Sequence, residues 1–192
     1  NPSSAHSYGR EARTIIEDSR KVIADLLHTS PGSIFFTSGG TEANNMAIKR
    51  SIYDQNIKHA ITSKIAHPAV LAPLHELSDR GLITLSYVEI DNKGRISLPD
   101  LRNKLNSSPS SFVSIMHANN EIGTIQDIEK IGHICQEFNA VFHSDTVQTI
   151  GHYPFDMQRL NVDFMAASAH KFHGPKGIGF SYISENIKIK PF

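Results

Sequence analysis

A serine, a histidine and a lysine stand together where an apolar run of the sequence ends. Residues 163–167 (DFMAA) read as a short buried strand, and Ser168, His170 and Lys171 follow it before Gly174-Pro175 interrupts any helix. Lys171 therefore lies on a turn at the end of a predicted core strand. A lysine there can be a solvated surface charge, a cation that binds phosphate, or an amine that forms a Schiff base with a carbonyl cofactor.

A second polar cluster, Ser38-Gly39-Gly40-Thr41, joins a predicted strand at 33–37 to a predicted helix at 41–53. Glycine lets the backbone approach an anion closely, and a helix N-terminus offers free N–H groups with a partial positive charge. Gly40 and Thr41 are therefore candidates for a phosphate site. The spacings of a Walker A loop and of a dinucleotide-binding fingerprint are absent, and a tight turn with a helix cap is the alternative interpretation.

Four further polar side chains follow predicted strands. Asp145 ends the strand at 140–144, and its carboxylate could bind a metal, act as a base, pair with a protonated ring nitrogen or only cap a helix. Gln148 lies three residues further on and could face the same ligand. Asn120 could donate its amide to a ligand oxygen, although asparagine is also common in turns. His67 opens a helix and could stack on a ligand ring, carry a proton or be a structural histidine.

His170 and His173 are three residues apart, a spacing that can chelate a metal ion. Metal sites in proteins need further ligands that converge on the ion, and the sequence offers no evident third one. We therefore predict no metal site. A metal hydrolase built on His170, His173 and Asp145 is the most distant interpretation.

The composition excludes several classes of partner. The chain carries 19 Lys and Arg against 19 Asp and Glu, so its formal net charge is +0, and no basic block is available for nucleic acid or an anionic membrane. No apolar run approaches the roughly 20 residues of a membrane helix. The single cysteine, Cys135, excludes an internal disulfide and favours a reducing compartment, so we predict a cytoplasmic protein.

Helical and strand patterns alternate along almost the whole chain. Helices are predicted at 8–28, 41–53, 67–80, 97–105 and 127–139, and strands at 33–37, 59–63, 82–90, 112–117, 140–144, 163–167 and 178–183. Ser97 and Asp100 predict a capping box at the fourth helix. The alternation predicts an α/β domain with a mainly parallel sheet and helices on both faces. In such a sheet ligands bind beyond the carboxyl ends of the strands, where nearly every polar cluster above falls.

Together the polar clusters describe one ligand. It has a phosphate, a ring nitrogen that needs a carboxylate, a ring oxygen that needs amides and an aldehyde that needs a lysine. The phosphate would meet Gly40, Thr41, Ser168 and His170, and the ring nitrogen would meet Asp145. The ring oxygen would meet Asn120 and Gln148, and the aldehyde would meet Lys171. Pyridoxal 5′-phosphate has all four features. If the ligand were a nicotinamide or ATP, Lys171 and Asp145 would have no common role in binding it.

The same segments resemble the cysteine desulfurases that supply sulfur for iron–sulfur clusters, a branch of the fold-type-I pyridoxal-phosphate enzymes related to class-V aminotransferases. The matching segments, in the family's order and over nearly the whole chain, are NPSSAHSYG, FTSGGTEANNMAIK, ITSKIAHPAV, VSIMHANNEIGTIQDI, FHSDTVQTIGHYPFD and SAHKFHGPKGIG. The resemblance implies that residues 1–192 form an incomplete cofactor-binding large domain. We expect its N-terminal strand and its C-terminal small domain to lie outside the chain.

The resemblance implies catalytic roles for Lys171 and His67: Lys171 holds the cofactor's aldehyde and removes the substrate's Cα proton, and His67 stacks on the ring. The implied cofactor-binding set is Gly40, Thr41, His67, Asn120, Asp145, Gln148, Ser168, His170 and Lys171. The implied reaction converts L-cysteine to L-alanine and passes the sulfur to an enzyme cysteine as a persulfide. The implied partners are a second copy of the chain and an iron–sulfur scaffold or another sulfur acceptor.

One departure from the family concerns sulfur transfer. The family's persulfide-carrying cysteine lies in a loop well beyond the lysine, and this chain ends before it. Cys135 lies instead in the predicted helix at 127–139 on an apolar stretch with Ile131, Ile134 and Phe138, so we predict a buried structural thiol. We therefore expect that this chain alone does not complete desulfuration.

Two alternatives stay open. Another fold-type-I enzyme, such as a selenocysteine lyase or an aminotransferase, would share the cofactor site, although the NNEIG, SAHKFHGPKGIG and NPSSAHSYG segments favour a desulfurase. A non-catalytic module would bind pyridoxal phosphate and turn nothing over. The loop that carries or lacks the persulfide cysteine would separate the enzymes, and a turnover assay would separate them from the module.

Overall fold

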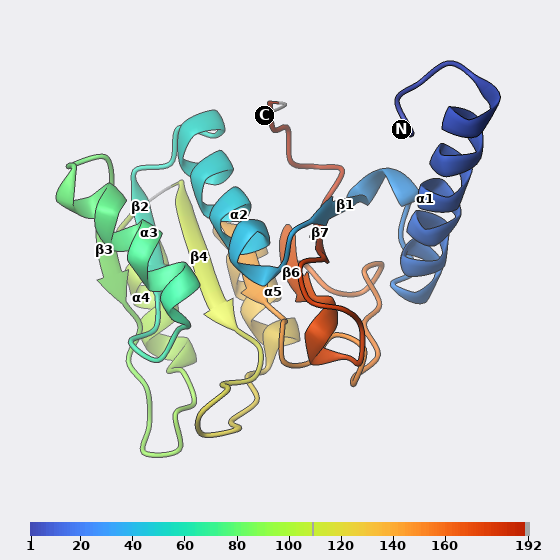
Figure 1. The fold of residues 1–192 in the computed structure, drawn as a ribbon. Helices are drawn as coiled ribbons and strands as arrows, with labels where there is room; N and C mark the ends of the chain where they lie inside the picture. The colour runs from blue at the N-terminus through green and yellow to red at the C-terminus, as the bar shows by residue number, and fades with distance from the viewer. Residues whose placement is uncertain (109, 191–192) are drawn as a thin grey trace.

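One seven-stranded sheet organises the residues that the computed structural model describes, 1–108 and 110–190 (Figure 1). Pro109, Pro191 and Phe192 belong to the predicted domain at 1–192 but lie outside the described residues. The strands are β1 (Ile34–Thr37), β2 (His59–Thr62), β3 (Thr84–Tyr87), β4 (Ser111–Met116), β5 (Val141–Asp145), β6 (Phe164–Ser168) and β7 (Gly179–Ile183). All seven overlap predicted strands, although β3 covers only four residues of the strand predicted at 82–90.

The sheet has the order β1-β7-β6-β5-β4-β2-β3 and is mainly parallel, as predicted. Strands β2 to β5 pair only in parallel with their neighbours, and β7 runs antiparallel between β1 and β6. The described loop from β6 to β7 contains no crossover helix, and a parallel return needs one. The carboxyl ends of β1 and of β2 to β6 therefore lie at one edge of the sheet.

Helices cover both faces of the sheet (Figure 1). The helices are α1 (Ser7–Leu26), α2 (Gly40–Asp54), α3 (Pro68–Asp79), α4 (Leu98–Asn106) and α5 (Ile128–Glu137), with short 3-10 turns η1 (Pro31–Ser33) and η2 (Ala169–Lys171). Helices α2 and α3 lie on one face, α4 and α5 on the other, and α1 stands beside the β1 edge. In the part of the chain described here, no helix is long and apolar enough to cross a membrane.

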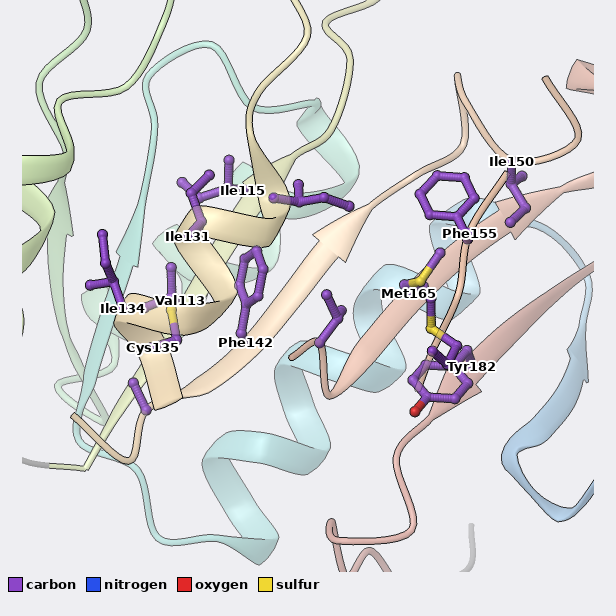
Figure 2. Close-up of a cluster of buried hydrophobic side chains, with 14 of the residues drawn as sticks. Val113, Ile115, Ile131, Ile134, Cys135, Phe142, Ile150, Phe155, Met165 and Tyr182 are labelled. Atoms are coloured by element: carbon purple, nitrogen blue, oxygen red, sulfur yellow. The ribbon is translucent and has the colours of Figure 1, made fainter. Parts of the chain in front are cut away.

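Successive side chains of the central strands point to opposite faces of the sheet, so the core has two layers. Val113, Ile115 and Phe142 pack with Cys135 and its apolar neighbours on α5, and Met165 belongs to the same cluster but lies nearer Phe155 and Tyr182 (Figure 2). Cys135 is 1% exposed, which confirms the predicted buried thiol. Each large apolar side chain buried in this way contributes roughly 1.5–3 kcal/mol to folding. The intervening residues of the same strands face α2 and α3.

The start of α4 confirms one half of the predicted capping box and corrects the other. Ser97 Oγ accepts a hydrogen bond from the Asp100 backbone N–H at 3.3 Å. The Asp100 carboxylate does not return the bond to Ser97; it accepts from the Glu89 backbone N–H at 2.8 Å and from Lys104 Nζ at 2.9 Å. The loop before α4 supplies a competing donor that sequence spacing does not reveal.

Candidate active site

All nine predicted site residues line one cavity of about 300 Å³. They are Gly40, Thr41, His67, Asn120, Asp145, Gln148, Ser168, His170 and Lys171. The cavity lies at the carboxyl edge of the sheet, because Asp145 is the last residue of β5 and Ser168 the last of β6. The starts of α2 and α3 border it as well. The topology therefore gathers polar residues that are far apart in sequence.

The cavity has a buried floor and an exposed rim. Asp145, Ser168 and Gly40 are buried, whereas Lys171 and His170 are exposed. The floor thus holds a carboxyl group and backbone N–H groups, and the rim holds an amine that a solute can reach. Such a gradient suits a ligand whose ring is enclosed and whose reactive carbonyl faces the entrance.

Asp145 is the most constrained of the predicted residues. Its side chain accepts hydrogen bonds from the Val147 backbone N–H at 3.1 Å and from Asn44 Nδ2 at 2.8 Å. Burial raises the pKa of Asp145 above its ordinary value, and the two hydrogen bonds and the nearby His67 oppose that rise only in part. A cationic ligand group beside Asp145 would stabilise its charged form.

The turn before α2 lets a ligand approach the protein backbone closely. Gly39 has φ +151°, a conformation that L side chains rarely adopt, and a Cβ on Gly40 would lie 2.5 Å from Val147 Cγ2. No side chain of the described residues caps α2, so the N–H groups of its first turn remain available to a ligand. Ser168 Oγ lies 3.0 Å from His170 Nδ1 and borders the same cavity. The site can therefore hold a phosphate.

His67 serves as the N-cap of α3. Its Nδ1 accepts the Ala69 backbone N–H at 3.1 Å, so Nδ1 carries no proton and Nε2 carries the proton of the neutral ring. The same side chain lines the cavity. The structural and the functional interpretations of His67 are thus compatible: the cap fixes the ring, and the ring borders the ligand space.

Lys171 lies in η2, a single 3-10 turn directly after β6, in agreement with the predicted turn. Its backbone carbonyl lies 2.8 Å from His152 Nε2, which ties the turn to the loop after β5. Asn120 on the rim donates to Glu121 Oε1 at 2.7 Å, and Gln148 is half-buried. Lysine and amides therefore border the same space as the buried Asp145.

The family of the chain follows from its match to known proteins. A family model described as "Aminotransferase class-V" matches residues 1–191. The chain belongs to the aminotransferase class-V family. The match spans nearly the whole sequence and agrees with the resemblance drawn from the six segments.

Curated relatives of this class-V chain are named as desulfurases. It is 47% identical over 193 residues to "Cysteine desulfurase IscS" of Dictyoglomus turgidum, covering 100% of this chain and 48% of the relative. It is 44% identical to the protein of the same name from Methanosarcina thermophila, covering 100% of this chain and 47% of the relative. The chain spans about half the length of the curated relatives it matches.

Solved structures confirm the fold class. A "NIFS-LIKE PROTEIN" superposes with a TM-score of 0.93 at 41% identity over 100% of this chain and 53% of that one. "SspA in complex with cysteine" superposes with a TM-score of 0.93 at 36% identity over 100% of this chain and 56% of that one. The class-V chain therefore has the fold of NifS-like proteins.

Sequence reasoning missed Asn44, which lines the cavity and bonds to Asp145. A signal was available. Asn44 lies three and four residues before Ala47 and Ile48, on the buried stripe of an otherwise amphipathic helix. A polar side chain at such a position must find a partner in the core, and only the fold shows that the partner is Asp145.

The structure separates the two histidines that could have chelated a metal. His170 lines the cavity, whereas His173 packs against His152 with 6.2 Å between ring centroids. Within residues 1–108 and 110–190, no group of three or more His, Cys, Asp or Glu side chains is arranged to hold a metal ion. Lys171 and Asp145 line the same cavity as His170, and His173 does not.

Proposed function

We propose that the protein is a pyridoxal-phosphate-dependent cysteine desulfurase, which converts L-cysteine to L-alanine and delivers the sulfur as a persulfide. One observation carries the proposal: a lysine and a buried aspartate share a cavity with seven other predicted residues, in a chain 47% identical to a protein named cysteine desulfurase. A structural relative whose name includes a complex with cysteine adds support for the substrate.

The residues of the cavity fit pyridoxal phosphate. The uncapped start of α2 at Gly40 and Thr41, with Ser168 and His170 bordering the same space, suits the phosphate. Asp145 is buried at the floor of the cavity, where a protonated ring nitrogen would stabilise its charged form. When bound, the cofactor supplies a carbonyl that bonds to amines and a cationic ring that withdraws electrons from the substrate's Cα.

The side chains around the cofactor then divide the remaining tasks. Lys171 Nζ would hold the cofactor at its aldehyde carbon, and the same amine would accept the proton from the substrate's Cα. His67 presents Nε2 because its Nδ1 is engaged with Ala69, so Nε2 can exchange a proton with the substrate. Asn120 and Gln148, which line the same cavity, would donate amide N–H hydrogen bonds to the ring oxygen.

Cys135 does not serve as the sulfur carrier in this proposal. It is buried among apolar side chains, and that burial, with a smaller contribution from Asp163, raises the pKa of its thiol far above the ordinary value. A nucleophile for sulfur transfer must be a thiolate that the substrate can reach. We infer that a different thiol accepts the sulfur, so the 192 residues alone bind the cofactor without releasing alanine.

The proposal includes a homodimer, a cytoplasmic location and delivery of sulfur to an iron–sulfur scaffold or another acceptor. The names of the relatives support the pathway. Support for the dimer comes from α1, which leaves Tyr8, Ile15, Val22 and Leu26 more than half exposed on one helix.

The cofactor is tested first. The chain is mixed with pyridoxal phosphate, its visible absorbance is recorded, the adduct is reduced with borohydride, and the modified lysine is mapped by mass spectrometry. We expect the adduct at Lys171, and its loss in Lys171→Ala. Lys176→Ala is the matched control, because Lys176 lies in the same loop but does not line the cavity. An adduct at another lysine would contradict the proposal.

Substrate is tested in the full-length protein. Three reactions are compared. They are the release of alanine and sulfide from L-cysteine, the release of alanine and selenide from L-selenocysteine, and the transfer of an amino group from an amino acid to a 2-oxo acid, which forms a new amino acid. We expect alanine and sulfide from L-cysteine. Selenide release alone would favour a selenocysteine lyase, amino transfer would favour an aminotransferase, and cofactor binding without any turnover would favour a binding module.

A further inference from the structure

Asn44 is a polar side chain on the buried, mainly apolar face of α2. It is 1% exposed, with the apolar residues Ala43, Ala47 and Ile48 buried around it on the same helix. Its Nδ2 donates to Asp145 Oδ2 at 2.8 Å, and its Oδ1 is buried without a hydrogen-bond partner among the described residues. A buried amide whose N–H group is hydrogen-bonded but whose carbonyl oxygen has no partner needs a specific explanation.

We propose that Asn44 is a positioning residue, whose amide fixes the orientation of the Asp145 carboxylate and keeps it charged beneath the cofactor ring. The inference rests on the proposed function, because it assigns Asp145 to the ring nitrogen. Asn44 itself does not touch the reacting atoms in this assignment. It acts on them only through Asp145.

Geometry supports this role because each Asp145 oxygen has its own donor. Oδ1 accepts the Val147 backbone N–H at 3.1 Å from the loop that follows β5. Oδ2 accepts Asn44 Nδ2 from α2, 101 residues away in sequence. Two donors from different elements prevent rotation of the carboxyl group, and donors to both oxygens favour its charged form. Replacing Asn44 would leave Asp145 Oδ2 without its donor and remove one of the two hydrogen bonds that favour the charged carboxylate.

The other charged or titratable groups around Asp145 do not duplicate the Asn44 amide. His67 approaches from the start of α3, His170 and Lys171 border the cavity from η2, and His143 lies two residues earlier on β5.

The neighbouring strands and the rest of the α2 start add no donor. Met116 on β4 and Ala166 on β6 stand beside Asp145 in the sheet and do not titrate. Glu42 on α2 accepts the Ser38 backbone N–H at 2.6 Å. Asn44 is therefore the one side-chain hydrogen-bond donor to Asp145 among the described residues.

The test is Asn44→Leu, which keeps the branched shape of the side chain and removes the donor, with Asn44→Ala as a smaller second variant that favours the helix. Aspartate is labelled with ¹³C at its carboxyl carbon in the cofactor-free chain, and the Asp145 signal is titrated. We expect its midpoint to move to higher pH in both variants. In the loaded protein we expect the dissociation constant of pyridoxal phosphate at neutral pH to rise by about tenfold.

Ser51→Ala is the matched control, because Ser51 is buried two turns further along α2 and its hydroxyl has no partner in the described residues. We expect it to leave the Asp145 midpoint unchanged. An unchanged midpoint in folded Asn44→Leu and Asn44→Ala, checked by circular dichroism, would overturn the inference. The titration needs no cofactor, so failure of the parent chain to bind pyridoxal phosphate would reject the proposed function separately.

Discussion

Asp145 and Asp163 are two acids beside the same pair of strands, but they lie at opposite ends of the sheet. Asp145 closes β5 at the carboxyl edge, and Asp163 immediately precedes β6 at the amino edge. Burial raises the pKa of both carboxyl groups, and each accepts a backbone N–H, from Val147 in the first case and Phe142 in the second. By the direction of their pKa shifts alone, the two acids look alike.

Their surroundings differ. Asp145 shares its cavity with Lys171, His67 and His170. Asp163 borders a second cavity, of about 430 Å³, and the described residues that line it bring amides, hydroxyls, apolar groups and the buried Cys135 thiol, but no lysine, arginine or histidine. A perturbed acid indicates a functional site only where other reactive groups converge on the same space. The comparison therefore assigns chemistry to the carboxyl edge and packing to the amino edge.

The largest effect is expected for Asp145→Asn in the full-length protein. The amide still accepts the Val147 N–H but carries no negative charge, so it could not stabilise the protonated ring nitrogen of the proposed cofactor. We expect the turnover of L-cysteine to fall by about 100-fold or more, with a circular dichroism spectrum like that of the parent protein. Alanine release measures the rate.

Asp163→Asn is the control for this comparison. Its amide oxygen can still accept the Phe142 N–H, and its side chain does not line the cavity of Lys171. We expect turnover within about twofold of the parent rate, as for substitutions away from the reacting groups. Equal losses in the two variants would show that the distinction between the two edges is wrong.

An intermediate effect is expected for Gly40→Ala, which tests how tightly the carboxyl edge is built. The new Cβ would lie 2.5 Å from Val147 Cγ2, so Val147 or the start of α2 must move. We expect the dissociation constant of pyridoxal phosphate to rise by about tenfold, measured by its visible absorbance.

Two variants make the Gly40 result specific. Gly32→Ala is the matched control, since a Cβ there would meet only Ser30 Oγ at 3.5 Å, an ordinary contact. Combining Gly40→Ala with Val147→Ala removes the colliding methyl and should restore most of the affinity. If the double variant binds as weakly as Gly40→Ala, the steric explanation fails.

Much of this arrangement could be predicted from the sequence because the fold follows simple rules. Alternating periodicities predicted the five helices and the parallel sheet, and a parallel sheet brings the ends of its strands to one edge. Residues such as Lys171, Asp145 and Gly40 each lie at or just beyond the end of a strand, so the rule gathers them without any knowledge of their distances.

What could not be predicted depends on contacts between distant segments. The bond from Asn44 to Asp145 joins α2 to β5, and sequence patterns carry no distance between two such elements. The antiparallel direction of β7 depends on a loop without a crossover helix, and its residues read as an ordinary strand. The bond from Asp100 to Glu89 depends on where a loop returns. In each case a local rule is valid but a tertiary partner decides the outcome.

The smallest effect is expected in the pH dependence of stability, where Asp163→Asn should differ from the parent chain. Because burial raises the pKa of Asp163, the folded state binds this proton more tightly than the unfolded state. Its contribution to the free energy of unfolding is therefore greatest at acidic pH and falls as the pH rises through the raised pKa. The Asp163→Asn variant has no such carboxyl group, so it should gain stability relative to the parent as the pH rises from about 3 to about 7.

Denaturant unfolding at several pH values measures this difference, and subtraction removes the background from the histidines. His143 is fully buried, and burial lowers its pKa to about 3, so its contribution has the opposite sign: stability is lost as the pH falls below the ordinary histidine value. Both proteins keep His143, and its contribution cancels in the difference. A constant difference between the two proteins across this range would mean that Asp163 titrates normally, and the likeness in pKa between the two ends of the sheet would then be wrong.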